Sequence, residues 1–238
     1  MNGELRVPLF DMVISLTNAM DLVSPALVNH HSRVAYVASG LAGVLKLPSD
    51  VQRDVMLAGA LHDVGALSLK DRLDSMSFDC SGDSISNHGN LSCALLETFS
   101  PFSSVAPLTR YHHTPWEGSE GERVPLGGHI LNLADRVSVL IDEQRDAQAQ
   151  IKEVIERVRH QSGRKFHPEL VEAFSELAMH DDFWRELLSP EVASILRSRF
   201  RSATVQLDLE GILSLAKLFG RIIDFRSRFT ATHSCGVA

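Results

Sequence analysis

Cysteine is scarce in this sequence, and its placement excludes a disulfide framework. Cys80, Cys93 and Cys235 are odd in number, lie far apart and form no CxxC arrangement. Such cysteines are typical of reduced thiols, so we expect a cytoplasmic protein. Residues 1–16 lack a basic region before their apolar stretch, and Asp11 interrupts that stretch. No signal peptide is therefore expected at this end.

Long apolar runs and an excess of positive charge are also lacking. No stretch reaches the roughly 18 uninterrupted apolar residues that a membrane span needs, so no membrane partner is expected. Lys and Arg number 23 against 30 Asp and Glu, which gives a net charge of −7. This balance argues against a surface for a nucleic-acid polymer. Hydrophobic residues make up 44% of the 238, enough for one large core or two modest ones.

Strand-like alternation is missing as well, and helical periodicity takes its place. Apolar residues recur at three- and four-residue steps over most of the chain, which predicts an all-α fold. Polar or Gly-rich stretches at 68–87 and 114–128 predict loops. The predicted helices cover residues 9–23, a second segment that carries His30 near its start and continues through 34–45, and then residues 51–61, 91–99, 105–111, 130–141, 147–160, 168–179, 181–188, 190–200 and 207–223.

Against this background, seven residues of the metal-ligand type stand out: His30, His62, Asp63, His88, His112, His113 and Asp135. Imidazole and carboxylate groups suit divalent ions such as iron, manganese or zinc. Seven ligands are too many for one ion, whereas two ions about 3.5–4 Å apart can share them through a bridging carboxylate. The remaining histidines of the central region, His129, His160, His167 and His180, are expected to be surface or hydrogen-bonded residues.

The order of these residues resembles the HD phosphohydrolase superfamily. The pair His62-Asp63 lies in LHDVG, with HHSRVA before it and NHGN, YHH and ILNLADRV after it. The stretch SGRKFHPELVEAF is similar to an element typical of the HD-GYP branch. Its matching positions are Gly163, Phe166, Pro168, Leu170, Val171, Ala173 and Phe174. The resemblance covers about residues 20–178, and it is specific because several separated motifs agree.

This resemblance implies an HD-domain helical bundle with additional C-terminal helices and a binuclear metal centre. Asp63 would be the bridging and catalytic carboxylate. One ion would take His30, His62, Asp63 and Asp135, and the other would take Asp63, His88, His112 and His113. The cofactor would be two divalent metal ions, with iron or manganese favoured over nickel or zinc.

The surroundings of the ligands depart from the family pattern. The family usually reads HDxGK, with a Lys that meets the substrate's phosphate, and this chain has Ala66 there. After the His doublet, Trp116 and Gly118 match the family's loop, but Glu117 replaces Asp and the Gly-Tyr-Pro element is missing. Some members hold a third ion with a Glu at the position of Ala26, so a binuclear site is the better expectation.

Two arginines are candidates to replace the missing Lys. Arg33 lies one helical turn after His30, and Arg136 directly follows Asp135. A guanidinium can bind phosphate through two hydrogen bonds, so either residue could bind the substrate. The alternative, a surface ion pair, is the commoner role of Arg and stays open.

A repeat links the two ends of the chain. DLVSPALVNHHSRVA, from Asp21, aligns without gaps on DFRSRFTATHSCGVA, from Asp224, so that His30 matches His233. We expect residues 1–203 to form the HD-GYP-like domain and residues 204–238 to be the opening helices of a truncated second HD unit. A plain C-terminal helix with an incidental His remains the alternative.

The sequence thus supports two functions of different classes. The first is a metal-dependent phosphodiesterase or phosphohydrolase that acts on cyclic di-GMP or a related nucleotide phosphoester. The second is a degenerate, catalytically weak signalling module that binds metal and a nucleotide or a partner protein. The ligand set favours the first, and Ala66 with the altered loop favours the second. The expected partner is a small-molecule nucleotide, and both a signalling protein partner and a homodimer stay open.

Overall fold

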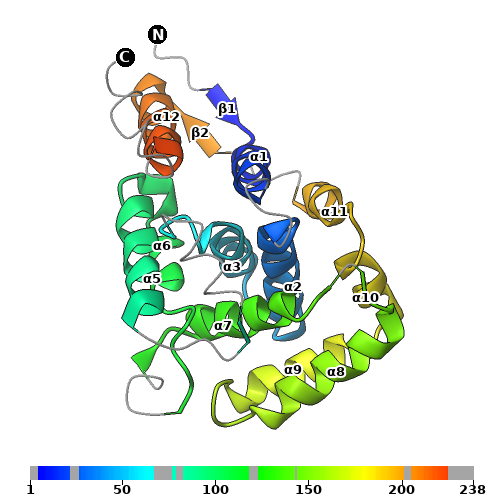
Figure 1. Cartoon of the computed structure of the whole chain (residues 1–238). Coiled ribbons are helices and arrows are strands. Elements are labelled where there is room, and N and C mark those ends of the chain that lie inside the picture. Colours follow the sequence, from blue (N-terminus) through cyan, green and yellow to red (C-terminus); the bar gives the residue numbers. More distant parts are fainter. Residues whose placement is uncertain are drawn as a thin grey trace.

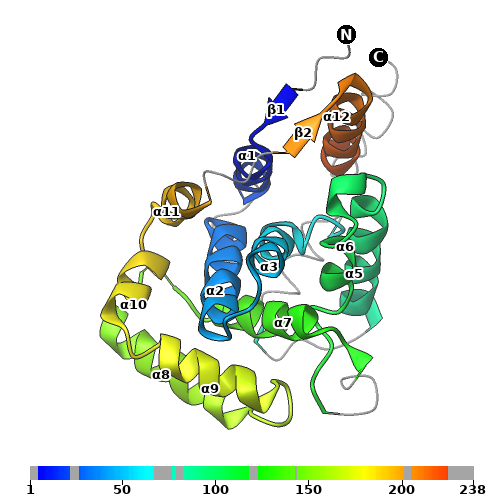
Figure 2. The same ribbon diagram turned by 180° about the vertical axis from the view of Figure 1, so that it is seen from behind.

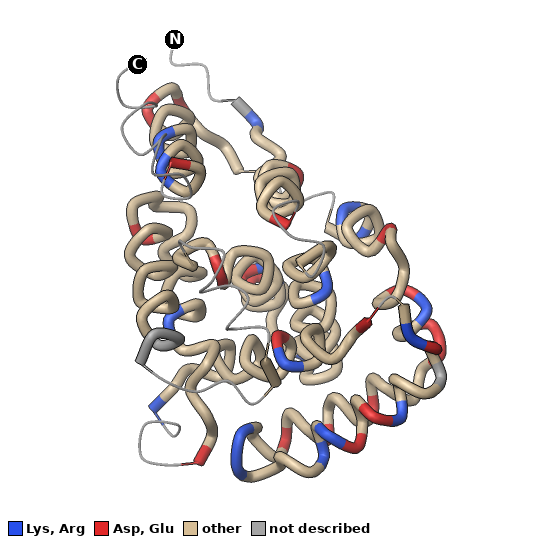
Figure 3. Tube along the Cα trace, in the orientation of Figure 1, with Lys and Arg blue, Asp and Glu red and all other residues tan. Residues whose placement is uncertain are grey.

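The described part of the chain is a helical assembly, as expected (Figure 1). The computed structural model describes residues 5–21, 27–66, 77–78, 83–117, 123–142, 144–200 and 205–224. Among these residues, none belongs to a helix that is long and apolar enough to cross a membrane. Acidic and basic residues are mixed along the outer helices that run from residue 147 to residue 177 (Figure 3). The all-α fold class is confirmed.

The elements follow one another in an order dominated by helices. They are β1 (Leu5–Val7), α1 (Leu9–Asp21), α2 (His30–Val44), α3 (Ser49–Leu61), α5 (Asp83–Leu96), the 3-10 helix η2 (Ser100–Phe102), α6 (Ala106–Arg110), α7 (Leu126–Val139), α8 (Ala147–His160), α9 (Pro168–Leu177), α10 (Asp181–Leu187), α11 (Val192–Arg199), β2 (Val205–Leu207) and α12 (Leu209–Asp224).

Several helix boundaries follow from residues with a clear local role. Pro125 comes directly before α7, and Pro168 is the first residue of α9, where a missing backbone N–H costs nothing. The carboxylate of Asp146 accepts a hydrogen bond from the backbone N–H of Ala149, 2.9 Å away, and caps α8.

Two predicted loops were drawn too long. Helix α5 begins at Asp83, inside the stretch assigned to the loop 68–87, so His88 lies within a helix and not at its edge. Helix α7 begins at Leu126, inside the loop 114–128. Gly127 and Gly128 misled the prediction, because they serve the close packing of α7 against α6 and the residue that follows it. A Cβ on Gly127 would lie 2.8 Å from the side chain of Leu108.

Helix α2 forms the centre of the molecule and is buried on nearly all sides. It packs against α1, α3, α7, α9 and α11, and the two opposite views show it enclosed by these elements (Figures 1 and 2). Its small residues, including Ala35 and Ala38, let neighbouring helices approach closely. Since α2, α3 and α7 all meet here, the residues near their ends are brought to one place.

The ends of the described chain meet in a small two-stranded sheet that the sequence did not predict. Strands β1 and β2 pair antiparallel, with Arg6 opposite Gln206 at the centre. Each strand has only three residues, too few for an alternating pattern to be recognised. Helix α12 then packs on α5, and Leu215, Leu218 and Ile222 join the common apolar core.

If residues 204–238 open a second HD unit, Leu209, Leu213, Phe219 and Ile223 are expected to be hidden, either against the rest of the chain or against another copy of the tail. Helix α12 packs on α5, but its buried apolar residues are other ones. Leu209, Leu213 and Ile223 remain 71%, 51% and 53% exposed, and Phe219 is half-buried. The division of the chain between residues 203 and 204 stays a prediction. His233 lies outside the described residues, as do Ala26 and Gly118.

Candidate metal centre

The seven predicted ligands converge from five helical elements. His30 is the first residue of α2, His62 directly follows α3 with Asp63 next to it, and His88 lies within α5. The doublet follows α6, and Asp135 lies on α7. All seven are buried except His113, which is partly buried. Residues more than 100 positions apart in the sequence thus share one site.

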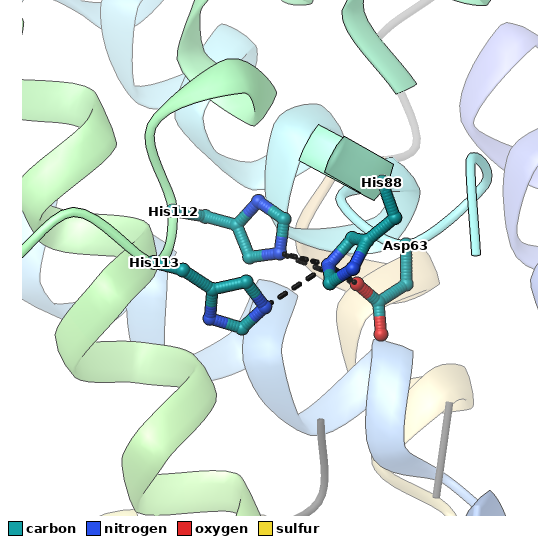
Figure 4. Close-up of side chains that lie close together, drawn as sticks. All are labelled: Asp63, His88, His112 and His113. Atoms are coloured by element: carbon teal, nitrogen blue, oxygen red, sulfur yellow. Dashed lines mark hydrogen bonds and ion pairs between the residues drawn. The ribbon is translucent and has the colours of Figure 1, made fainter. Parts of the chain in front are cut away.

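The side chains fall into two groups whose ligand atoms lie within 4.8 Å of one another. We call His30, His62 and Asp135 the first group, and Asp63, His88, His112 and His113 the second group (Figure 4). The two ligand sets implied by the family resemblance differ from these groups in one residue, because both sets contain Asp63 and only the second group does. The assignment of ligands to ions stays a prediction.

Asp63 lies between the two groups, with one carboxylate oxygen toward each. Its Oδ1 is 3.1 Å from Nε2 of His88 and 3.3 Å from Nε2 of His112. Its Oδ2 is 3.5 Å from Nε2 of His62, in the first group. A carboxylate placed in this way can bind one ion through each oxygen, which is the geometry of a bridging ligand.

The imidazole rings present ring nitrogens to one another at short range. Nε2 of His88 is 3.1 Å from Nε2 of His112 and 3.0 Å from Nε2 of His113. In the first group, the Nε2 atoms of His30 and His62 are 3.4 Å apart. Buried nitrogen lone pairs that face one another are unfavourable unless a cation or a proton lies between them.

Hydrogen bonds at the opposite ring nitrogens decide which atom is free to bind metal. Nδ1–H of His62 donates to the carbonyl of Gly59 over 2.8 Å, and that of His112 donates to the carbonyl of Thr109 over 2.6 Å. Each acceptor belongs to the helix that delivers the histidine. These bonds hold the protons on Nδ1 and leave Nε2 as the ligand atom, the arrangement common at metal sites.

Burial keeps two of the histidines neutral. Burial is the main reason that the pKa of His30 falls to about 3, and the carboxylate of Asp135 offsets only part of the effect. Burial, followed by His112 and Arg136, also holds the pKa of His113 well below its usual value. A neutral imidazole is the form that binds a metal ion.

The two carboxylates stay ionised although they are buried. Burial opposes ionisation of Asp63, but His62 and His88 outweigh it and hold the pKa of this carboxyl well below its usual range. For Asp135, burial is likewise opposed, by Arg136 first and by His62 next, and the pKa is lowered. Anionic carboxylates together with imidazole nitrogens are the donor set that suits divalent ions, so the residues present fit two such ions.

The two arginines proposed for phosphate binding are buried beside this centre. Nε of Arg136 donates to Oδ2 of Asp135 over 3.2 Å, and its other nitrogens contact Asp135 and the carbonyl of Ser77. Arg33 is 4% exposed and lies on α2, one turn after His30. Arg136 therefore orients Asp135, and a role for either residue in substrate binding stays a prediction.

The altered loop after the doublet is anchored to the element that suggested the HD-GYP branch. Backbone N–H groups of Trp116 and Glu117 donate to the carbonyls of Lys165 and Arg164, over 3.1 and 2.7 Å. The ring of Trp116 also contacts His167, with centroids 4.1 Å apart. Ala66, at the position of the family's Lys, is fully buried.

Supporting residues behind the ligands were missed by the sequence analysis. Ser138 lies one turn after Asp135 on α7, and its hydroxyl oxygen is 3.1 Å from Nδ1 of His30. His31 pairs with Asp21, and its ring contacts that of His62, with centroids 5.3 Å apart. The three-residue step from Asp135 to Ser138 and the doublet His30-His31 were the available signals.

Ser138 provides a direct test of this supporting layer. We expect Ser138→Ala to weaken metal binding by roughly 10- to 100-fold, because Nδ1–H of His30 loses its acceptor. A competition titration with a chelator measures the change. Ser39→Ala removes a buried hydroxyl of α2 that donates to the carbonyl of Tyr36, away from the candidate ligands, and it should leave metal affinity unchanged. Equal affinities for the two variants would contradict the assigned role of Ser138.

Comparison with known families and structures agrees with this geometry. A family model described as HD domain matches residues 27–140, the segment that contains all seven ligands. This match supports the predicted HD superfamily, whereas the HD-GYP branch stays a prediction. A crystal structure of a cyclic GMP-AMP specific phosphodiesterase of Vibrio cholerae, V-cGAP3, has the same fold, with a TM-score of 0.74 at 21% identity. The match covers 98% of this chain and 63% of that one.

Curated relatives are similar at low identity. The chain is 26% identical over its full length to 3′3′-cGAMP-specific phosphodiesterase 1 of Vibrio cholerae serotype O1, of which it covers 58%. It is 24% identical to the cyclic di-GMP phosphodiesterase of Thermotoga maritima, over 62% of this chain and 44% of that protein. The chain therefore spans less than two thirds of the length of either relative.

Proposed function

We propose that this protein is a metal-dependent phosphodiesterase that hydrolyses a cyclic dinucleotide, cyclic di-GMP or a related molecule such as 3′3′-cGAMP. The observation that carries the proposal is the position of Asp63, whose two carboxylate oxygens face two separate ligand groups. A purely structural domain has little need for seven converging ligand groups in a buried site. The names of the similar proteins support the substrate class.

Two divalent ions bound here would supply Lewis acidity and a nucleophilic oxygen near neutral pH. The residues of the chain contribute the geometry. His30, His62 and Asp135 would hold one ion, and His88, His112 and His113 the other, while Asp63 would fix the spacing between them. The bonds at Nδ1 of His62 and His112 keep the rings in place before substrate arrives, so little reorganisation is needed during the reaction.

Turnover of metal-loaded protein tests the proposal. We expect protein loaded with iron or manganese to convert cyclic di-GMP or 3′3′-cGAMP to the linear dinucleotide, as followed by chromatography. Protein stripped with a chelator serves as the control and should be inactive. If loaded protein binds two ions and yet cleaves no cyclic dinucleotide or simple phosphodiester, the enzymatic function is wrong.

A second function, a binding module without efficient turnover, is favoured by the surroundings of Ala66. This residue is fully buried, so it places no cation at the position of the family's Lys. The guanidinium of Arg136 is already bonded to Asp135 and to the carbonyl of Ser77. In this case the protein would bind metal and a nucleotide, or a partner protein, while hydrolysing little.

Restoring the cation distinguishes the two functions. We expect Ala66→Lys to raise kcat/KM by about tenfold or more, because a preorganised cation stabilises charge that develops in the transition state. Ala66→Met is the matched control, since it adds a chain of similar length without the charge. If Met raises turnover as much as Lys, the gain comes from packing and not from the cation. If Lys leaves a measurable parent activity unchanged, another group already supplies the charge.

Alanine variants identify which residue supplies the positive charge in place of the family's Lys. Arg33→Ala and Arg136→Ala each remove one candidate guanidinium. A residue that binds the substrate's phosphate should raise KM when it is replaced, with metal content unchanged. Because Arg136 bonds to Asp135, its replacement should instead change metal content if its role is only to orient that ligand.

A further inference from the structure

Helix α12 has more apolar surface than its packing on the rest of the chain uses. One face, with Leu215, Leu218 and Ile222, is buried in the common core. A second face is polar and carries Glu210, Lys217 and Arg221. The third face consists of Leu209, Leu213, Ala216, Gly220 and Ile223, and we call it the outer stripe. Its three large residues are at least half exposed.

The repeat within the chain shows that this face is built for packing. Helix α1, like α12, begins two residues after a short strand and ends at an aspartate, and the two strands pair with each other. When Asp21 is aligned on Asp224, Phe10, Val13, Thr17 and Met20 fall on the last four residues of the outer stripe: Leu213, Ala216, Gly220 and Ile223. All four are buried in α1, whereas none of their counterparts is buried in α12.

On the opposite faces of the two helices, the pattern of burial is reversed. The three buried apolar residues of α12 align on Met12, Ser15 and Ala19, of which none is buried in α1. Helix α12 is thus attached by the face that α1 leaves outside, and it exposes the face that α1 packs against α2 and α3. An exposed apolar stripe on such a helix is typical of a protein interface.

We propose that the outer stripe is a dimer interface that binds the outer stripe of a second copy of this chain in antiparallel orientation. A pair centred on Ala216 would place Leu209 of one copy opposite Ile223 of the other, at both ends. The small residues Ala216 and Gly220 lie in the middle, where they let the two backbones approach. The interface is self-complementary in size, as a twofold dimer requires.

Charge on the neighbouring polar face favours the antiparallel orientation. Glu210 lies in the first turn of α12 and Arg221 in the last. Glu210 and Arg221 form no ion pair with any other residue in the described part of the chain. In the antiparallel pair, Glu210 of each copy comes to the same height as Arg221 of the other, on the same side of the interface. A parallel pair would instead place the polar faces of the two copies on opposite sides of the interface, where Glu210 and Arg221 could not pair.

The first test measures the mass of the chain as a function of its concentration. We expect the parent protein to form dimers, and Leu213→Glu to raise the dissociation constant by roughly a hundredfold or more, since each substitution occurs twice in the dimer. Met179→Glu is the matched control, because Met179 is a 74% exposed apolar residue outside α12 and should not affect association. Circular dichroism shows whether each variant keeps its helices.

The second test addresses the orientation. The Glu210→Arg chain carries a basic group at each end of the polar face, and the Arg221→Glu chain carries an acidic group at each end. Each variant alone should dimerise several-fold more weakly than the parent, and their mixture should form mainly heterodimers, because both cross-pairs are then attractive. Native mass spectrometry measures the ratio of heterodimer to homodimers.

Three results of these two tests would contradict the proposal or the orientation of the helices. A parent chain that stays monomeric at the highest soluble concentration overturns the proposal. Dimers that resist Leu213→Glu as well as Met179→Glu also overturn it, because another surface must then associate. Dimers that are sensitive to Leu213→Glu but show no preference for heterodimers in the mixture contradict the antiparallel register.

Discussion

Asp63→Asn is expected to remove both metal ions and to lower turnover by roughly a thousandfold or more. The substitution keeps the shape of the side chain and replaces one carboxylate oxygen by a nitrogen that cannot bind a cation. Because Oδ1 faces the second group and Oδ2 faces the first, a change at this one carboxylate should weaken the binding of both ions. Elemental analysis should show about two divalent ions per parent chain and fewer than one per variant chain.

Two further variants make this result specific. His112→Gln removes a ligand from the second group alone and should leave the ion of the first group bound. His160→Gln changes an exposed histidine at the end of α8 and should leave both ions in place. Retention of both ions by Asp63→Asn would show that the carboxylate is not the bridge. Absence of metal from the parent, even after iron or manganese is added, would overturn the metal centre itself.

The candidate ligands could be recognised in the sequence because each lies in a local sequence pattern. A His-Asp pair at the end of an apolar helix, a His doublet and an Asp on an amphipathic helix each have a recognisable pattern. Their order along the chain then indicates which of them share a site. The described part of the structure brings all seven together in two groups, and their binding of two ions bridged by Asp63 stays a prediction.

What could not be predicted depends on contacts between distant segments. The hydrogen bond of Ser138 to His30 joins α7 to α2, and the position of Ser138 one turn after Asp135 does not by itself identify that partner. Strands β1 and β2 are stabilised by each other, and neither has a pattern of its own. In α12, apolar residues cover two adjacent faces, so periodicity alone did not show which face would be buried.

The tight packing around the His-Asp pair leads to the second prediction with a large effect. Gly65, two residues after Asp63, lies directly against α5. A Cβ at this position would be 2.4 Å from the carbonyl oxygen of His88 and 2.4 Å from the backbone nitrogen of Ser92. Both are backbone atoms of a helix, so they cannot move aside as the end of a flexible side chain would.

We expect Gly65→Ala to lower the free energy of unfolding by about 3 kcal/mol or more, because the turn must separate from α5. For a chain of this size, that corresponds to a decrease in Tm of roughly 6–12 °C. The backbone N–H of Gly65 donates to the hydroxyl of Ser92 over 2.9 Å, and that hydroxyl donates to the carbonyl of His62 over 2.6 Å. When the turn separates from α5, both of these hydrogen bonds through Ser92 are broken, so metal affinity should fall together with stability.

Gly43→Ala is the matched control for this substitution. Gly43 lies in α2, and a Cβ there would meet no atom within 4 Å. In a helix, Ala is favoured over Gly by about 0.5–1 kcal/mol, so this variant should be as stable as the parent or slightly more so. Thermal unfolding of the two variants in the absence of metal separates packing from ligand binding. Equal unfolding temperatures of Gly65→Ala and Gly43→Ala would contradict this packing. The turn that holds His62 and Asp63 would then not lie against α5, and the short distance between Asp63 and His88 would need another explanation.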